Sequence, residues 1–548
     1  MAPQARVQSP APTARPSSAP AAPAAPQMKI REERYGDLVR RQSRPVGEWG
    51  GNFGTCFWTF FVPTCIYYWY GISVMHGGRL VVPGPRFWYD LVFTLPDGIA
   101  IRPVLGPTLV SFTWVACCAL GEMILPGKLV EGVMLKNGKR LLYPMNGLLC
   151  FFLSHVGLAL SCYFGVLAPH YAFMNMGALL TEAVITSYAL ALWLYIDFGL
   201  LWKRHVNDDE FEEDHGVFTV KEFFSDFWLG VVRNPRLFKG VLKVPFDLKR
   251  FWNARPGLTV WVMFNFSYMA GMYYNCRLPS AYKSGEPLFF GDHMSKSADL
   301  EGLFKGADAA SFCDSTGSFA NIGPAAIFIS FAHWWYIFDY NVAEPAYLTT
   351  TDIRHDLFGF MLTYGDWGFL SRYYPISFMG FLAVQGGTAS GFINANYACV
   401  TIGVLVFAVG MVLFRITNIE KHLFRTHMND GGEADKYRSP WSTRLFFGDK
   451  KVQYLKTKEG SLLLTSGFWG LARHFNYIGD LIMCLGWATA CYSPGSPFPW
   501  VPLSYCVYFW IMDLHRAWRD ESRCSQKYGE DWERYKEAVP YIILPGVI

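Results

Sequence analysis

The sequence predicts an all-α polytopic membrane protein, and both its composition and its apolar runs indicate this class. Of the 548 residues, 52% are hydrophobic and only 17% are charged, whereas soluble domains contain about 25% charged residues. Several apolar stretches reach the roughly 20 residues that a membrane-spanning helix needs. Counting these stretches predicts about ten transmembrane helices. The net charge of +4 is small and gives no indication of nucleic-acid binding.

The first 46 residues are predicted to form a tail that precedes the membrane domain, which covers residues 47–548. Residues 1–27 are rich in Ala, Pro and Ser and contain no acidic residue, and a charged stretch follows from Lys29 to Arg44. No apolar segment follows the early charges, which argues against a cleaved signal peptide. A disordered cytosolic tail is the simpler interpretation. A transit peptide is the alternative, which the many prolines disfavour.

The predicted spans are separated by two long polar segments. The spans are residues 53–75, 107–125, 143–167, 179–202, 255–274, 324–338, 357–384, 395–414, 477–491 and 501–514. Within the polar segment 203–255, apolar residues at helical spacing over 223–232 predict a helix lying at the membrane interface. The segment 275–317 is rich in Gly, Ser and Asp and is predicted to be a loop insertion outside the lipid. The thirteen Cys show no C-x-x-C pair, so they predict neither a zinc site nor a disulfide framework.

Lys and Arg concentrate in three regions, which are residues 203–255, residues 415–458 and the C-terminal tail. With an even number of spans between them, the positive-inside rule predicts that all three lie on the cytosolic face. A soluble phosphorylated cofactor would be found on that face.

A short polar run lies at the mouth of the ninth predicted span. It contains Arg473, His474, Asn476, Tyr477 and Asp480. Five polar groups at the mouth of a membrane helix are costly unless something polar binds there. We therefore interpret this run as part of a site for an anionic cofactor.

Two further clusters are expected on the same face. They are Asn418, Lys421 and Arg425, and then Arg516, Arg519, Asp520, Arg523, Lys527 and Tyr528. The first three residues fall at i, i+3 and i+7 on one helical face. Arg and Lys are suited to phosphate oxygens, so a nucleotide with several phosphates is a natural ligand. Neither a Rossmann nor a P-loop motif is present, and anchoring to lipid headgroups is the alternative for each single cation.

Four carboxylates, three between the sixth and seventh spans and one inside the seventh, are candidates for acid–base chemistry. They are Asp339, Glu344, Asp352 and Asp366. Ionisable groups at membrane depth usually face a wet or protein-lined cavity. The alternative is that each is a hydrogen-bonded carboxylate that stabilises helix packing.

Several of these motifs together resemble a known family. The run Gly467–Leu481 resembles a signature of the membrane sterol reductases, which act on Δ14, Δ7 or Δ24(28) double bonds, and the closing run Arg519–Tyr541 is similar to a second signature. Shorter motifs match in the same order, and the resemblance covers almost everything after Gly47. These shorter motifs are Leu125-Pro126-Gly127, Asn234-Pro235-Arg236 and Phe414-Arg415 with Asn418, Lys421 and Phe424-Arg425.

Within the family the motifs are closest to the 7-dehydrocholesterol reductase branch. Ala472–Tyr477 and Leu544-Pro545-Gly546 favour that branch, whereas Glu48–Gly51 resembles the Δ24(28) branch. The chain departs from the family in the seventh span, where Ser371 and Ser377 replace a Pro and a Gln and Arg372 is inserted.

The resemblance implies a ten-span protein of the endoplasmic reticulum membrane whose residues 395–548 form an NADPH-binding half. Its substrate would be a sterol taken from the bilayer, so membrane lipid surrounds the site. The cofactor-binding positions that it implies are Lys421, Arg425, Arg473, Asn476, Tyr477, Asp480, Arg519, Asp520, Arg523, Lys527 and Tyr528. No metal is implied.

The expected reaction adds a proton and a hydride across an alkene. An isolated alkene accepts hydride poorly, so protonation must precede or accompany the hydride transfer, and this requires a well-placed acid. The candidate proton donors are Tyr477, Asp339, Glu344, Asp352 and Asp366.

Two other classes compete with the reductase interpretation. A membrane methyltransferase that uses S-adenosylmethionine has a similar C-terminal pattern, but its cofactor has no phosphates and would not need Lys421 and Arg425. A non-catalytic sterol-binding scaffold would not need intact cofactor positions. These positions are chemically intact here, which favours the reductase.

Overall fold

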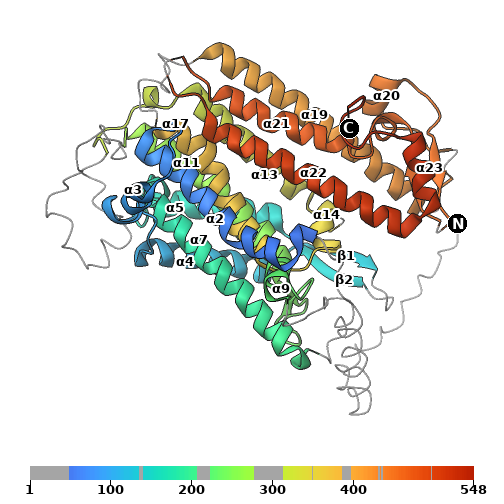
Figure 1. Ribbon diagram of the computed structural model, residues 1–548, viewed down its shortest axis with the longest axis horizontal. Coiled ribbons are helices and arrows are strands. Elements are labelled where there is room, and N and C mark those ends of the chain that lie inside the picture. The colour runs from blue at the N-terminus through green and yellow to red at the C-terminus, as the bar shows by residue number, and fades with distance from the viewer. Residues whose placement is uncertain are drawn as a thin grey trace, which may run out of the picture.

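The computed structural model describes residues 48–548 except 135–139, 206–221, 277–312, 349, 385–395, 430–431, 434–435, 459, 495 and 548. Long helices packed side by side make up most of the molecule (Figure 1). The predicted tail 1–46 and most of the predicted loop 275–317 fall outside the described residues.

In the view of Figure 1, the long helices α19, α21 and α22 lie above α4, α5 and α7. The first-half helices are η1 (Glu48–Gly50), α2 (Gly51–His76), α3 (Pro85–Tyr89), η2 (Asp90–Thr94), α4 (Leu105–Ile124), α5 (Gly147–Tyr163), α6 (Tyr171–Met174), α7 (Met176–Leu194), η3 (Tyr195–Leu200), η4 (Trp202–Arg204), α9 (Phe223–Leu229), α10 (Leu248–Trp252), η6 (Asn253–Gly257) and α11 (Leu258–Tyr273). The second-half helices are η8 (Phe319–Asn321), α13 (Pro324–Val342), α14 (Glu344–Tyr347), α15 (Thr351–Arg354), α16 (Phe360–Tyr364), η9 (Gly365–Tyr373), η10 (Ile376–Gly380), α17 (Phe381–Val384), α19 (Tyr397–Asn429), α20 (Trp441–Phe447), η13 (Gly467–Gly470), α21 (Phe475–Ala490), α22 (Trp500–Tyr528) and α23 (Glu530–Ala538).

Three described helical segments are long and apolar enough to cross a membrane, namely Leu105–Ile124, Met176–Leu200 and Tyr397–Met428. The other predicted spans also coincide with helices, but several are shorter or interrupted. The predicted span 357–384, for example, is divided into α16, η9, η10 and α17, of which η9 and η10 are π-helical. The mostly helical class is confirmed, while the count of about ten spans stays a prediction.

Three short antiparallel hairpins interrupt the helical pattern and were not predicted. Their strands are β1 (Lys128–Met134), β2 (Arg140–Met145), β3 (Arg236–Leu237), β4 (Phe246–Asp247), β5 (Tyr454–Lys456) and β6 (Leu462–Leu464). β1 pairs with β2, β3 with β4, and β5 with β6. Each hairpin belongs to a polar connection between helices. Counting apolar runs identifies membrane helices and does not detect short strands in such connections.

A disulfide joins Cys276 to Cys313, although the cysteine spacing predicts no pairing. The backbone N–H of Asp314 donates to Tyr274 O at 2.8 Å, so the two ends of the 275–317 segment meet beside the end of α11. The pairing therefore depends on a tertiary approach of segments 37 residues apart, which spacing alone does not reveal.

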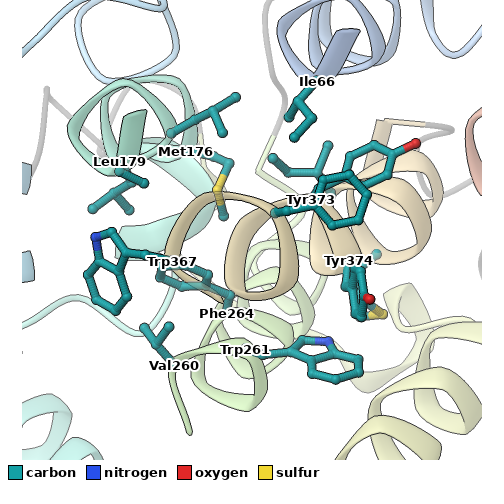
Figure 2. Close-up of a cluster of buried hydrophobic side chains, with 14 of the residues drawn as sticks. Ile66, Met176, Leu179, Val260, Trp261, Phe264, Trp367, Tyr373 and Tyr374 are labelled. Atoms are coloured by element: carbon teal, nitrogen blue, oxygen red, sulfur yellow. The ribbon is translucent and has the colours of Figure 1, made fainter. Parts of the chain in front are cut away.

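The aromatic core lies where η9 passes between α7 and α11, and Figure 2 shows its side chains around the central helix. The labelled side chains are Ile66, Met176, Leu179, Val260, Trp261, Phe264, Trp367, Tyr373 and Tyr374. The inserted Arg372 is also buried here, where it pairs with Glu182 at 3.1 Å and lies 3.7 Å from the Trp367 ring centre. The carboxylate and the indole face make this buried charge tolerable.

The helix expected over 223–232 exists as α9, and its position at the membrane interface stays a prediction. Asn52 Oδ1 accepts hydrogen bonds from the backbone N–H groups of Phe224 and Ser225 at 2.9 and 3.2 Å. Trp228 is buried, and α9 packs on α2 and α16. The buried aromatic residues of α9, Phe227 and Trp228, therefore contribute to the core of the protein.

Candidate functional site

The three predicted polar clusters meet where α19, α21 and α22 come together with the segment that carries α15 (Figure 1). α19 and α21 pack closely against each other because glycines face each other along the pair. A Cβ at Gly410 would lie 2.7 Å from Gly479 O, and one at Gly403 would lie 2.6 Å from Gly486 O. Small residues allow such close backbone approach between membrane helices. The antiparallel register that these pairs define brings Lys421 beside the start of the Arg473–Asp480 run.

Arg473 is directed into the protein. Its Nε donates to Glu521 Oε1 at 2.6 Å, and its Nη1 donates to the carbonyls of Val539 and Pro540 at 2.6 and 3.0 Å. Its backbone N–H also donates to Tyr541 O at 3.0 Å. Arg473 therefore fastens the C-terminal segment to α22, which is a structural task alongside the predicted cofactor contact.

Three arginines of α22 form ion pairs with the segment that carries α15. Arg516 Nη2 donates to both oxygens of Asp352 at 3.0 and 3.3 Å. Arg519 and Arg523 donate to Asp356 Oδ1 at 2.8 and 3.2 Å. Burial raises the pKa of the Asp356 carboxyl, but the three arginines outweigh burial and hold the pKa below its ordinary value. Asp356 is thus ionised at neutral pH.

Lys249 also binds the segment that carries α15. Its side chain is buried, and Nζ donates to the carbonyl oxygens of Asp356 at 2.8 Å and Ile353 at 3.4 Å, and to that of Asp352. Burial lowers the pKa of Lys249 to about 8. Lys249 and the arginines of α22 therefore contact the same segment, while the predicted common cytosolic face stays a prediction.

Positive charge is in excess beside this anchored segment. Lys421 Nζ lies 3.8 Å from the Trp469 ring centre and, like Arg425 and Arg354, forms no ion pair with a carboxylate of the described residues. Arg425 interacts electrostatically with both Lys421 and Arg354, and Asp520 is the carboxylate in reach of Lys421 and Arg425. A row of cations in which Arg425 repels both of its neighbours favours the binding of an anion.

A second polar group lies deeper, between α13, α21 and α22. Asn476, Tyr477 and Asp480 are half-buried, and within the described chain their side chains form no hydrogen bond. Asp480 interacts electrostatically with Asp513 and with Tyr336 of α13. Half-buried polar groups left without protein partners are available to a ligand.

The remaining acid candidates are engaged by the protein. Asp339 pairs with Arg415, and Asp366 Oδ1 accepts from Asn253 at 2.7 Å. Glu344 belongs to a buried ion cluster with Glu122, Arg250 and Arg255, and it accepts from Gly147 N at 2.9 Å. These contacts match the alternative that such carboxylates stabilise helix packing.

The outer residues of the predicted cofactor set lie nearer the surface. Asp520 Oδ2 is 3.7 Å from Nε2 of the buried His474. Lys527 Nζ donates to Tyr528 Oη at 3.1 Å, and Asn418 donates to Phe414 O of its own helix at 2.8 Å.

Sequence reasoning missed three residues of this region. Arg354 lies in a short helix among acidic residues and gave no signal of its own. Tyr336 is part of the run Trp334-Trp335-Tyr336, which is typical of packing. Asp513 is an ionisable residue inside a predicted span, which is the signal that should have identified it.

A family model described as the ergosterol biosynthesis ERG4/ERG24 family matches residues 100–278 and 310–548, which is more than half of the chain. The chain belongs to this sterol reductase family. It is therefore an oxidoreductase of sterol biosynthesis and a multi-pass membrane protein. The resemblance described above is confirmed at this level.

Similar proteins within the family carry two substrate names. The chain is 30% identical over 526 residues to a Delta(14)-sterol reductase of Dictyostelium discoideum, covering 95% of this chain and 96% of the relative. It is 30% identical over 534 residues to a Delta(14)-sterol reductase of Methylotuvimicrobium alcaliphilum, covering 95% and 99%. It is 28% identical over 536 residues to the 7-dehydrocholesterol reductase of Xenopus laevis, covering 93% and 97%. These identities do not separate the Δ14 from the Δ7 branch.

Proposed function

We propose that this protein reduces a double bond in the sterol ring system with NADPH in the endoplasmic reticulum membrane. The observation that carries the proposal is the excess of cations around Lys421, Arg425 and Arg354, next to the half-buried Asn476, Tyr477 and Asp480. An anion-binding rim beside a polar interior is suited to a cofactor with a phosphorylated end and a reactive end.

The donor set fits NADPH better than a cofactor without phosphates. Lys421, Arg425 and Arg354 offer point and fork-shaped positive charge for phosphate oxygens, and the amide of Asn476 offers both a donor and an acceptor. The exposed Lys527 and the half-buried Arg523 and Tyr528 would extend this rim. Bound NADPH would supply the hydride. S-adenosylmethionine would leave the three cations without a partner, so the methyltransferase alternative is disfavoured.

Asp480 is the proton donor that the surroundings favour among the acids of the site. Asp339, Glu344, Asp352 and Asp366 are held by arginines or by an amide, whereas Asp480 forms no hydrogen bond within the described chain and lies beside Tyr336. In this role the carboxyl group of Asp480 would hold the proton before its transfer. Transfer of that proton to the sterol alkene leaves a tertiary cation on the ring, which is then competent to accept hydride.

Two ring bonds are candidates for the substrate. The Ala472–Tyr477 motif favours Δ7, and the names of relatives at 30% identity favour Δ14. The side-chain bond Δ24(28) is supported only by Glu48–Gly51.

Sterol profiling tests the proposal. The protein is expressed in cells that lack Δ14-sterol reductase and, separately, in cells that lack Δ7-sterol reductase. We expect the accumulated precursor to disappear in one of the two hosts, and the Lys421→Ala/Arg425→Ala double variant to restore it. Unchanged sterols in both hosts, with folded protein in the endoplasmic reticulum, would support the scaffold alternative, and loss of only a Δ24(28) precursor would move the substrate to the sterol side chain.

A further inference from the structure

We propose that α20 is an anchor on the membrane surface. Its exposed apolar side chains enter the headgroup region of the bilayer, and the cations around it bind anionic lipid headgroups. α20 belongs to the basic connection between α19 and α21. The proposal concerns a surface outside the predicted cofactor set, and it holds whichever sterol bond the protein reduces.

α20 exposes its large apolar side chains and buries its small polar ones. Trp441, Leu445 and Phe446 are 74%, 75% and 54% exposed, whereas Ser442 and Thr443 are buried. Trp441 and Leu445 fall at i and i+4 on one face of the helix, and Phe446 adjoins Leu445. A helix on the surface of a soluble domain shows the opposite pattern, with its apolar side chains toward the protein. The exposed part of α20 is therefore suited to an apolar environment.

The contacts of α20 place it close to the point at which the apolar run of α19 ends. α20 packs on α19 near the C-terminal end of that helix (Figure 1). The ring centres of Phe446 and Phe447 lie 5.5 and 4.9 Å from that of Phe468, whose backbone N–H donates to Glu420 Oε2 at 3.2 Å. Glu420 follows the predicted span 395–414 by about 9 Å along the helix. α20 thus lies at the level expected for the membrane interface, where Trp concentrates.

The connection that carries α20 is strongly basic. Residues 436–458 contain seven Lys and Arg and a single acidic residue, Asp449. The two oxygens of Asp449 lie 3.6 Å from Arg438 Nη1 and 3.8 Å from Arg444 Nη1, so two arginines share one carboxylate. Lys450 follows directly and is exposed. Cations beside exposed Trp, Leu and Phe are typical of elements that bind anionic lipid surfaces. The charge therefore favours an anionic lipid over a neutral apolar partner as the occupant of this surface.

Photo-crosslinking of the full chain in lipid nanodiscs tests the anchor without sterol or cofactor. Leu445 and, in a separate variant, Trp441 are replaced by the photoreactive residue p-benzoylphenylalanine. The nanodiscs contain phosphatidylcholine with or without phosphatidylserine. We expect lipid adducts at both positions, with phosphatidylserine enriched about fivefold over its share of the lipid, which is the effect of one Lys or Arg at an anionic surface. The same replacement at Glu533, on the exposed surface of α23, is the control and should give no lipid adduct.

Charge variants test the preference for anionic lipid. Arg438→Glu/Lys450→Glu should abolish the enrichment of phosphatidylserine in the adducts, and high salt should weaken it because exposed charges are screened. Size-exclusion elution and thermal unfolding show whether each variant is folded. In folded protein, adducts to a second copy of the chain in place of lipid would overturn the proposal. Equal capture of neutral and anionic lipid, or no adduct at either position, would also overturn it.

Discussion

At the scale of single residues, the site is defined by side chains that the protein leaves without partners. Lys421 and Arg425 form no ion pair within the described chain, whereas Arg473 is hydrogen bonded to Glu521 and to two backbone carbonyls. A charge-assisted hydrogen bond contributes about 1.5–3 kcal/mol. Lys421 and Arg425, which form no such bond to a carboxylate, can therefore contribute binding energy to an anionic ligand.

Replacing Lys421 or Arg425 tests this assignment through cofactor preference. We expect Lys421→Ala and Arg425→Ala each to raise KM for NADPH by about 10- to 100-fold, because each loses a contact to phosphate worth about 1.4–3 kcal/mol. KM for NADH, which lacks the additional phosphate, should change much less. Lys436→Ala is the matched control, since Lys436 is exposed and pairs with Glu433 at 2.9 Å. Equal losses for NADPH and NADH would remove both residues from the phosphate site.

The sequence predicts these cations as a group but does not show which of them the protein itself engages. Spacing placed Lys421 and Arg425 on one helical face, and that placement holds in α19. The partners of Arg473 come from α22 and from the C-terminal segment, so its engagement depends on tertiary packing. The same limit applies to Glu344, whose ion cluster joins α4, α10, η6 and α14.

At the scale of elements, the segment that carries α15 links the first half of the chain to α22. Lys249 holds its backbone carbonyls, while Asp352 and Asp356 pair with Arg516, Arg519 and Arg523. The arginines occupy i, i+3 and i+7 of α22, so one face of that helix is fixed by this segment. The position of Asp513, on the same helix, follows from this contact.

Asp356→Asn tests how much this contact stabilises the fold. Removing a carboxylate from a buried ion pair costs about 3–5 kcal/mol, so the midpoint of thermal unfolding should fall by several degrees. Because the arginines hold the pKa of Asp356 below its ordinary value, its ionised form stabilises the fold above about pH 4, and this contribution is lost as the pH falls further. The difference in the free energy of unfolding between wild type and variant should therefore stay constant from about pH 5 to about pH 8. It should shrink in stronger acid.

The control for this variant is Glu533→Gln, which removes an exposed partner of Lys536. Exposed ion pairs contribute at most about 1 kcal/mol, so its unfolding midpoint should stay near that of wild type. An Asp356→Asn variant as stable as this control would contradict the anchoring account.

At the scale of the whole molecule, apolar length predicted the helices but not their interruptions. Runs such as 395–414 and 501–514 lie in α19 and α22, which continue past the apolar part and carry the polar site on their ends. The π-helical η9 and η10 arise where large side chains such as Trp367 and Phe378 pack in the core, and hydropathy does not register such packing. The hairpins and the Cys276–Cys313 disulfide are likewise set by contacts between distant segments.

The central claim is that a phosphorylated hydride donor binds where α19, α21 and α22 come together, and that the protein uses it to reduce a sterol ring bond. The direct measurement uses purified protein in lipid nanodiscs with sterol substrate and NADPH that carries deuterium at the reactive nicotinamide carbon. The account predicts that one deuterium appears in the ring system of the reduced sterol, and that Lys421→Ala/Arg425→Ala abolishes this labelling at limiting cofactor. A reduced sterol without deuterium, or unchanged sterol with Δ14 and Δ7 substrates alike, would contradict it.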